Sequence, residues 1–215
     1  MKTGLIFDLD GTLLDTLEDL LDATNRSLAE FGFPARTLEQ LRQVVGNGAA
    51  NQIRKSLPEG TSEEMVQQVL NFYKPYYTAH CQCKTKPYAG IGQALETLGR
   101  EYLLAIVSNK PDSAVKELCA VWFPGIYALG ERPDCPRKPA GDMVYRAMAD
   151  IGVENCIYIG DSEVDILTAQ NAKVPCLSVT WGFRDREQLE QAGGIYFCDQ
   201  PSQIVEKIEE MTHGK

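Results

Sequence analysis

Residues 5–16, with the sequence LIFDLDGTLLDT, constrain the fold of this 215-residue chain more than any other stretch. Leu5–Phe7 is a short apolar run of the kind that forms a buried strand, and Gly11 then ends the extended pattern. Asp8 and Asp10 therefore lie where a buried strand gives way to a loop. Ligands bind at that end of the strands in open α/β sheets, so this stretch predicts a functional site on such a sheet.

The two carboxylates allow three interpretations. Neighbouring anions repel each other unless a cation joins them, and oxygen ligands without His or Cys suit a hard cation such as Mg²⁺. One acid could instead be a nucleophile and the other a proton carrier. The third interpretation is a strand-end turn with two solvated acids. We favour the first two, because Asp8–Thr12 packs two acids, a turn glycine and a hydroxyl into five residues.

Length and composition limit the class of protein. The chain suits one large domain, or a domain with an insertion, and its net charge of -9 disfavours a nucleic-acid partner. No apolar stretch is long enough to span a bilayer, and Met1–Thr3 runs straight into the first strand, so we expect no signal peptide. The seven dispersed cysteines are therefore expected to be reduced thiols in a cytoplasmic protein.

The periodicity of apolar residues changes along the chain. From Asp15 to about Ala79 the spacing is helical, with no strand signal. From Tyr88 onward, short apolar runs alternate with amphipathic helices, which predicts a parallel sheet with helices on both faces. We therefore predict an α/β fold: a Rossmann-like parallel-sheet core (residues 1–14 and 84–215) with an inserted α-helical cap (residues 15–83).

Polar residues follow other predicted strands as well. Ser108 and Asn109 follow a buried run at 102–107, and Asp161 follows the run at 156–159. Lys138 comes just before a helix predicted to start at Pro139. Each residue alone has an ordinary explanation, as a solvated lysine or a helix cap. All strand carboxyl ends lie on one edge of a parallel sheet, however, so these groups could form one site for a metal and a phosphate.

The sequence resembles the haloacid dehalogenase-like phosphohydrolases, and within them the phosphoglycolate phosphatase-like group. Four family motifs occur in order: DLDGT at 8–12, VSNK at 107–110, Lys138-Pro139, and GDSEVD at 160–165. Two departures are Ser108, where relatives often carry Thr, and Ala140-Gly141, where they often carry a second proline. Neither departure removes a group that the chemistry needs.

This resemblance implies a reaction. Asp8 would attack phosphorus and form a phosphoaspartyl intermediate. Asp10 would protonate the leaving alcohol and then activate the hydrolytic water, with Thr12 orienting Asp10 and belonging to the substrate-binding set. An acid at position 10 also argues against a true dehalogenase. The residues alone leave open which aspartate is the nucleophile.

The resemblance also implies the binding groups. Ser108, Asn109 and Lys138 would bind the phosphoryl group, and Lys138 would also offset the charge of Asp8. The implied Mg²⁺ ligands are Asp8, the backbone carbonyl of Asp10, Asp161 and Asp165. The last of these could instead act through water or by holding Lys138.

One stretch of the cap stands out. Gly46, Asn47 and Gly48 interrupt a helical pattern at a cost of roughly 1 kcal/mol per glycine, which a close approach to substrate would explain. VGNGA at 45–49 resembles the corresponding segment of phosphoglycolate phosphatases, so Arg54 or Lys55 could meet a substrate carboxylate. A plain interhelical turn is the alternative.

A second stretch, near the end of the cap, contains His80, Cys81 and Cys83. These are soft ligands for zinc, but their spacing is unusual and a second pair is missing. We expect residues 82–87 to form the return hinge between cap and core instead, with Asp15–Leu17 as the outgoing hinge.

We expect an Mg²⁺-dependent hydrolase of a small phosphomonoester, with 2-phosphoglycolate as the first candidate substrate. The alternatives on the same core are a pyrophosphatase, a sugar-phosphate phosphatase, a nucleotidase or a phosphoglucomutase. A non-catalytic binding module is a third class, which the presence of Asp8, Asp10, Lys138 and Asp161 disfavours. The expected partner is a small phosphorylated metabolite, with no nucleic acid or membrane, and the chain is expected to be a monomer or homodimer.

Overall fold

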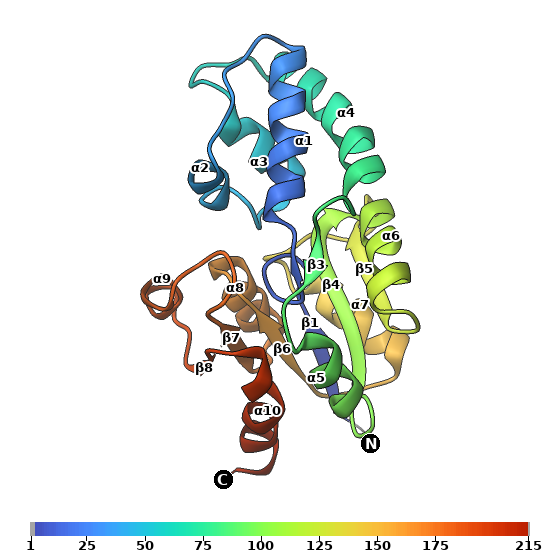
Figure 1. Ribbon diagram of the computed structural model, residues 1–215. Coiled ribbons are helices and arrows are strands. Elements are labelled where there is room, and N and C mark those ends of the chain that lie inside the picture. The colour runs from blue at the N-terminus through green and yellow to red at the C-terminus, as the bar shows by residue number, and fades with distance from the viewer. Residues whose placement is uncertain (1–2, 215) are drawn as a thin grey trace.

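The computed structural model describes residues 3–214, which form a parallel sheet below a group of helices (Figure 1). The sheet has six strands in the order β5-β4-β1-β6-β7-β8. These strands are β1 (Gly4–Phe7), β4 (Leu103–Pro111), β5 (Tyr127–Glu131), β6 (Cys156–Gly160), β7 (Cys176–Val179) and β8 (Tyr196–Cys198). All of their pairings are parallel. The predicted α/β fold class is thus confirmed.

Strand β1 lies inside the sheet between β4 and β6, and its apolar side chains are buried on both faces. Leu5 and Phe7 belong to one buried cluster and Ile6 to another, as the alternation of side chains along a strand requires. The first cluster includes residues of α5 (Ile91–Leu98), α6 (Asp112–Trp122) and α10 (Ile204–His213). The second includes residues of α7 (Asp142–Ile151) and α8 (Glu163–Ala172). Helices therefore cover both faces of the sheet. Two short pieces, α9 (Arg186–Gln191) and the 3₁₀ turn at Pro201–Gln203, complete this part of the chain.

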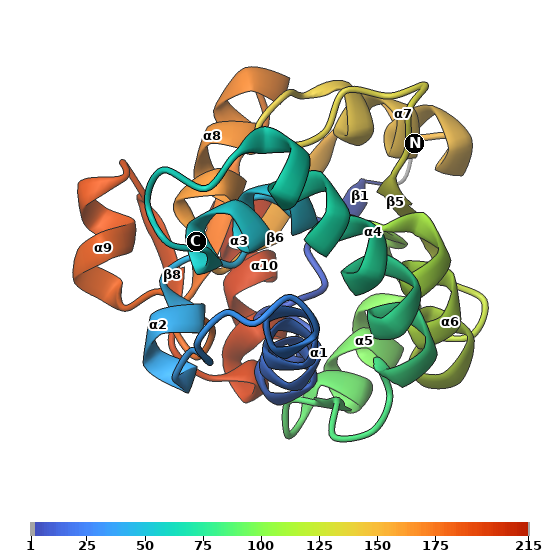
Figure 2. The ribbon, with the colours of Figure 1, turned by 90° about the horizontal axis from the view of Figure 1, so that it is seen from above.

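The inserted cap segment is built mainly from four helices joined by loops. They are α1 (Leu17–Glu30), α2 (Leu38–Arg42), α3 (Gly48–Ser56) and α4 (Glu63–His80). They lie above the carboxyl ends of the strands (Figure 1), and the view from above shows α1, α3 and α4 over the sheet (Figure 2). The cap therefore covers the sheet edge at which the sequence places its polar residues.

Two short antiparallel strands connect cap and core. Strand β2 (Leu14–Asp15) pairs with β3 (Lys86–Pro87), so the outgoing and returning chains run side by side. The buried Asp19 carboxylate accepts hydrogen bonds from the backbone N–H groups of Lys84 and Thr85, at 2.9–3.0 Å. The predicted borders at residues 15 and 83 lie in or next to these two connections.

Individual elements differ from the sequence expectation mainly at their ends. The strand expected at 102–107 continues to Pro111, and the helix expected from Pro139 begins at Asp142. The longer strand matters for the site, because it carries Ser108, Asn109 and Lys110 toward the cap. Within the described residues, no helix is both long and apolar enough to cross a membrane.

Candidate active site

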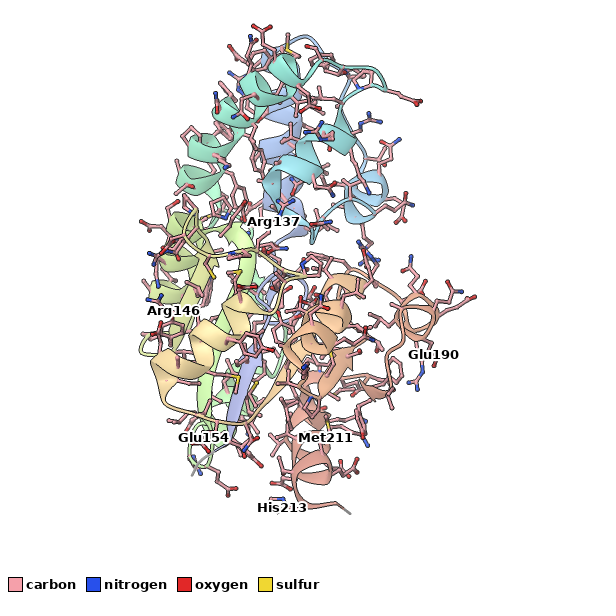
Figure 3. All side chains as sticks on the ribbon, turned by 180° about the vertical axis from the view of Figure 1, so that it is seen from behind. Arg137, Arg146, Glu154, Glu190, Met211 and His213 are labelled. Atoms are coloured by element: carbon pink, nitrogen blue, oxygen red, sulfur yellow. The ribbon has the colours of Figure 1, made fainter. Side chains whose placement is uncertain are left out.

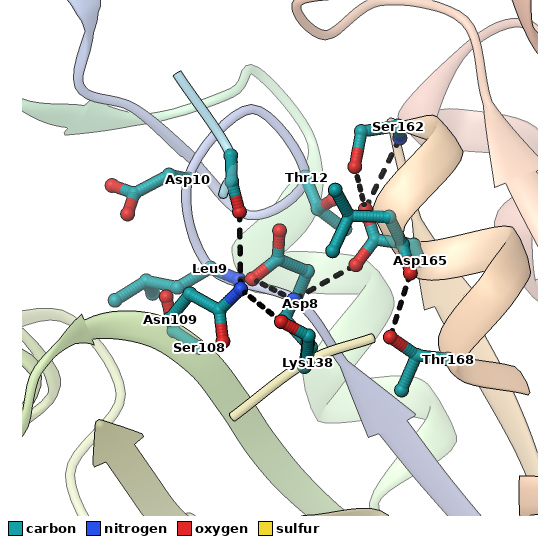
Figure 4. A network of polar contacts seen from close by, with 12 residues as sticks. Asp8, Leu9, Asp10, Thr12, Ser108, Asn109, Lys138, Ser162, Asp165 and Thr168 are labelled. Carbon is teal, nitrogen blue, oxygen red and sulfur yellow. Dashed lines mark hydrogen bonds and ion pairs between the residues drawn. The ribbon is translucent and has the colours of Figure 1, made fainter. Parts of the chain in front are cut away.

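The site forms where three neighbouring strands end. Phe7 at the end of β1 lies opposite Ile106 of β4 and Ile159 of β6. The residues at the carboxyl end of each strand are therefore brought together, although more than a hundred and fifty residues separate Asp8 from Asp161 in sequence. Figure 4 shows the resulting network of polar side chains.

Asp8 is buried at the centre of this network. Its Oδ1 accepts a hydrogen bond from the backbone N–H of Leu9 at 2.7 Å and lies 2.9 Å from Nζ of Lys138. Burial raises the pKa of Asp8 to about 7, because its charged form loses water, although Lys138 opposes this rise. A carboxylate in this position needs further positive charge to stay ionised at neutral pH.

Lys138 is held by two acids and a phenol. Its Nζ lies 2.8 Å from Oδ1 of Asp165 and donates to the Tyr158 hydroxyl at 2.9 Å. Burial alone would lower the pKa of Lys138, but Asp165 and Asp8 outweigh it and hold that pKa well above the usual range. The ammonium is therefore charged and fixed beside Asp8. Tyr158 is a residue that the sequence reasoning missed; its position in the apolar run CIYI suggests only packing.

Asp165 has both oxygens engaged by the protein. Oδ1 contacts Lys138, while Oδ2 accepts from the backbone N–H and the hydroxyl of Ser162 at 3.1 and 2.6 Å. Of the roles left open by the sequence, these contacts favour holding Lys138.

Asp161 is oriented by groups on both sides. Its Oδ1 accepts from the Thr12 hydroxyl at 3.0 Å, and its Oδ2 accepts from the Phe183 backbone N–H at 2.7 Å. The structure differs here from the expectation that Thr12 orients Asp10. A Cβ atom at Gly11 or Gly182 would lie 2.2 or 2.4 Å from Asp161 Oδ2, so glycine is needed at both positions.

Asp8, Asp161 and Asp165 form the acidic cluster of the described residues, with one carboxylate oxygen from each lying within 4.8 Å of the others. Burial raises the pKa of Asp161 well above its usual range, and the charges of Asp165 and Asp8 add to the rise. A bound divalent cation would offset both effects, and an all-oxygen set suits a hard ion. These residues therefore fit a divalent metal site.

The Asp10 side chain lies outside this cluster and turns away from Asp165 (Figure 4). Its Oδ1 lies 2.8 Å from Nζ of Lys110, a buried lysine that also donates to the Tyr77 hydroxyl. The Lys110 ammonium lies 4.4 Å from the centroid of the Tyr77 ring. Sequence reasoning gave Lys110 no role, although it follows Ser108-Asn109 in the same motif. The contact with Tyr77 of α4 depends on the cap, which a strand-end pattern cannot reveal.

Asp8 and Asp10 line a small cavity of about 30 Å³ between core and cap. Its core lining includes Asp8, Asp10, Ser108, Asn109 and Lys110, and its cap lining includes Gly46, Gly48, Gln52, Tyr73 and Tyr77. The cap loop thus reaches the site, as expected for Gly46 and Gly48, whereas Asn47 between them is not among the lining residues.

Contacts across the two parts hold this loop. Asn109 Nδ2 donates to the Lys138 carbonyl at 2.9 Å and to the Gly46 carbonyl at 3.3 Å. Gly48 has a φ of +75°, and a Cβ there would lie 2.5 Å from the guanidinium of Arg137. Figure 3 shows Arg137 at the boundary between cap and core.

The two cations expected to meet a substrate carboxylate lie elsewhere. Arg54 forms an ion pair with Glu63, and Arg54 and Lys55 both line a separate depression at the end of α3. His80 contacts the Tyr76 carbonyl through Nδ1 at 2.7 Å, and neither it nor Cys81 or Cys83 belongs to a metal-binding cluster within residues 3–214. Lys110 is the cation that lines the cavity.

The sequence profile of the haloacid dehalogenase-like hydrolase family matches residues 5–179. The chain belongs to this family. It is 31% identical over 206 residues to phosphoglycolate phosphatase 1 of Pseudomonas aeruginosa, with 91% of this chain and 75% of that protein covered. It is 32% identical over 207 residues to the phosphoglycolate phosphatase of Agrobacterium fabrum, with coverages of 90% and 87%.

A solved structure agrees over nearly the whole chain. A protein of Lactobacillus delbrueckii, whose name gives phosphoglycolate phosphatase as its proposed activity, superposes with a TM-score of 0.88 at 36% identity. The match covers 98% of both chains. The haloacid dehalogenase-like hydrolase described here thus falls in the phosphoglycolate phosphatase-like group, as its four motifs predict.

Proposed function

We propose that this phosphoric monoester hydrolase is Mg²⁺-dependent and acts through a phosphoaspartyl intermediate on Asp8. The observation that carries the proposal is the meeting of Asp8, Lys138 and Asp161 at one sheet edge. Asp8 has its charge partner Lys138 at 2.9 Å, and the acidic cluster beside it fits a hard divalent cation.

In the proposed first step, a carboxylate oxygen of Asp8 attacks phosphorus and the bond from phosphorus to the leaving oxygen breaks. Asp10, in its protonated form, donates a proton to that oxygen. Ser108 and the Lys138 ammonium bind the phosphoryl oxygens, and Lys138 also stabilises the charge of Asp8. Mg²⁺ held by Asp8, Asp161 and the Asp10 carbonyl would supply positive charge that offsets the negative charge of the phosphoryl oxygens.

In the proposed second step, Asp10 takes a proton from water, and the water oxygen attacks the phosphorus of the intermediate. The bond between phosphorus and the Asp8 oxygen breaks, which releases phosphate and restores both carboxyl groups. Asp10 is suited to both transfers because it borders the cavity, whereas Asp165 is fully engaged with Lys138 and Ser162.

We further propose 2-phosphoglycolate as the substrate, with Lys110 as the partner of its carboxylate. Lys110 lines the cavity beside Asp10, so it can bind an anion attached to the leaving oxygen. The names of the curated relatives support this choice.

The test is phosphate release from 2-phosphoglycolate, pyrophosphate, a sugar phosphate and a nucleotide, in MgCl₂ and in EDTA. We expect 2-phosphoglycolate to have the highest kcat/KM and EDTA to abolish the activity. A faster reaction with pyrophosphate would remove the substrate proposal and leave the mechanism standing. The absence of release from every compound would favour a non-catalytic binding module.

Lys110→Met tests the carboxylate partner, with Lys55→Met as its control outside the cavity. We expect Lys110→Met to lower kcat/KM for 2-phosphoglycolate by about a hundredfold. The substitution removes the buried positive charge that would pair with the substrate carboxylate. Ethyl phosphate, which has no carboxylate but also releases an alcohol that Asp10 must protonate, separates this effect from a disturbance of Asp10. Equal losses with both substrates would contradict the role of Lys110 in recognition.

The remaining parts of the proposal concern the cellular compartment, the oligomeric state and the binding partners. We propose a cytoplasmic enzyme that works as a monomer or homodimer on a small phosphorylated metabolite, without a nucleic-acid or membrane partner. All seven cysteines are free, which supports a reducing compartment.

A further inference from the structure

Arg184 is a buried arginine of the core that the reaction described above does not use. It follows β7 in the loop Trp181–Asp185, and this loop also supplies the Phe183 N–H that orients Asp161. The guanidinium forms four hydrogen bonds, two within the core and two to the cap. A buried arginine with divided contacts of this kind ties two parts of a protein together.

The core side of this contact is Glu163 in the first turn of α8. Arg184 Nε lies 2.8 Å from Glu163 Oε2, and Nη2 donates to Oε1 at 3.2 Å. Glu163 directly follows Ser162, which holds Asp165, and lies two residues after Asp161. The pair is therefore anchored on the segment that carries the acidic cluster.

The cap side consists of backbone carbonyls. Nη1 donates to the Arg42 carbonyl at 2.7 Å, and Nη2 donates to the Val45 carbonyl at 3.2 Å. Arg42 ends α2, where the last carbonyls of a helix need partners from outside it. Val45 is itself buried and lines the cavity, and Gly46 follows it. These contacts fix the loop that closes the cavity from above.

We propose that Arg184 is a positioning residue that, with Glu163, latches the cap segment 42–48 over the active site. This inference rests on the proposed function and adds to it the residue that sets cap closure. The planar guanidinium can bind one carboxylate and two carbonyls at once, whereas the single ammonium of lysine cannot span all three. Closure of this segment excludes water and keeps Gly46 and Gly48 against the substrate.

The experiment compares Arg184→Lys with Arg100→Lys, the same change in an exposed pair with Glu96 far from the cap. Hydrogen exchange of the full-length protein in MgCl₂ is the first readout. We expect faster exchange of amides in residues 42–50 for Arg184→Lys alone, with residues 156–160 of β6 unchanged. This readout needs no substrate.

Kinetics are the second readout. We expect Arg184→Lys to lower kcat/KM for 2-phosphoglycolate by about tenfold, mainly through KM, since it loses charged hydrogen bonds to the closed cap. The loss with ethyl phosphate, which lacks the carboxylate that we place in the cavity beneath the cap loop, is expected to be about twofold or less. Glu163→Gln, which keeps an acceptor oxygen, should give an intermediate loss.

Unchanged exchange at 42–50 would overturn the proposal, as would equal losses with both substrates together with faster exchange throughout the core. The second result would make Arg184 a residue of general stability. If the wild type releases no phosphate from 2-phosphoglycolate but the exchange change stays confined to 42–50, the latch stands and the proposed substrate fails.

Discussion

The sheet edge and the cap loop contribute to the same cavity in different ways. At the sheet edge, side chains contact side chains: Lys138 joins Asp8 to Asp165, and Thr12 holds Asp161. In the cap loop, the core holds backbone carbonyls, those of Arg42, Val45 and Gly46. The chemistry is thus encoded in side-chain identity, while the position of the cap is encoded in groups that every residue carries.

This comparison predicts that substitutions at the sheet edge affect the chemical step and those at the loop affect substrate binding. The largest expected effect is that of Asp8→Asn. An amide cannot attack phosphorus, so kcat should fall by about 10⁴-fold or more. Phosphate release measures the loss, and near-UV circular dichroism should show an intact fold. A fully active Asp8→Asn variant would contradict the assignment of the nucleophile.

Lys138→Met tests the ion network and should rank second. It leaves the buried Asp8 and Asp165 without their common cation, so the free energy of unfolding should fall by about 3–5 kcal/mol. Lys84→Met removes an exposed lysine that pairs with Glu18 and Asp22, and it should cost less than about 1 kcal/mol. Urea unfolding measures both. If Lys138→Met lowered the free energy of unfolding as little as Lys84→Met does, another group would have to neutralise Asp8 and Asp165.

Gly182→Ala tests whether the close approach to Asp161 serves metal binding. The new Cβ would lie 2.4 Å from Oδ2 and Cβ of Asp161 and from the Gly11 carbonyl oxygen, so both this side chain and the Gly11 loop must move. The concentration of Mg²⁺ for half-maximal activity should therefore rise about 10–100-fold. Gly92→Ala is the control, because nothing lies within 4 Å of a Cβ there. An unchanged Mg²⁺ requirement in Gly182→Ala would separate Asp161 from the metal.

Gly48→Ala should have the smallest effect on activity. It is also the substitution that best separates the role of the cap loop from that of the sheet edge. Gly48 and Gly60 both have positive φ, +75° and +81°, so alanine costs about 1–2 kcal/mol of strain at either position. A Cβ at Gly48 also meets Arg137, whereas Gly60 has open space. We expect KM to rise several-fold for Gly48→Ala alone, with kcat nearly unchanged in both variants. A fall in kcat without a change in KM would place this loop in the chemical step.

The sheet edge could be predicted from the sequence to a greater extent than the contacts between the core and the cap. The first strand and its acids were predictable because an apolar run followed by Asp8, Asp10 and Gly11 is a local pattern. The α/β class followed from the alternation of helix and strand. Lys110 and Arg184 were not predictable as functional residues, since their partners come from segments about thirty and more than a hundred residues away. Thr12 was assigned to Asp10, its neighbour in sequence, but its hydroxyl donates to Asp161, which follows the adjacent strand β6.

The sequence alone thus indicated which polar residues gather at the candidate site, because a parallel sheet brings the carboxyl ends of its strands to one edge whatever the details of packing. Only the tertiary structure decided which cation lines the cavity and how the cap is held. Arg54 and Lys55 have the right charge, but the direction of α3 turns them away from the cavity, and Lys110 enters it because β4 extends under α4. Such directions depend on how whole helices pack, which no short stretch of sequence encodes.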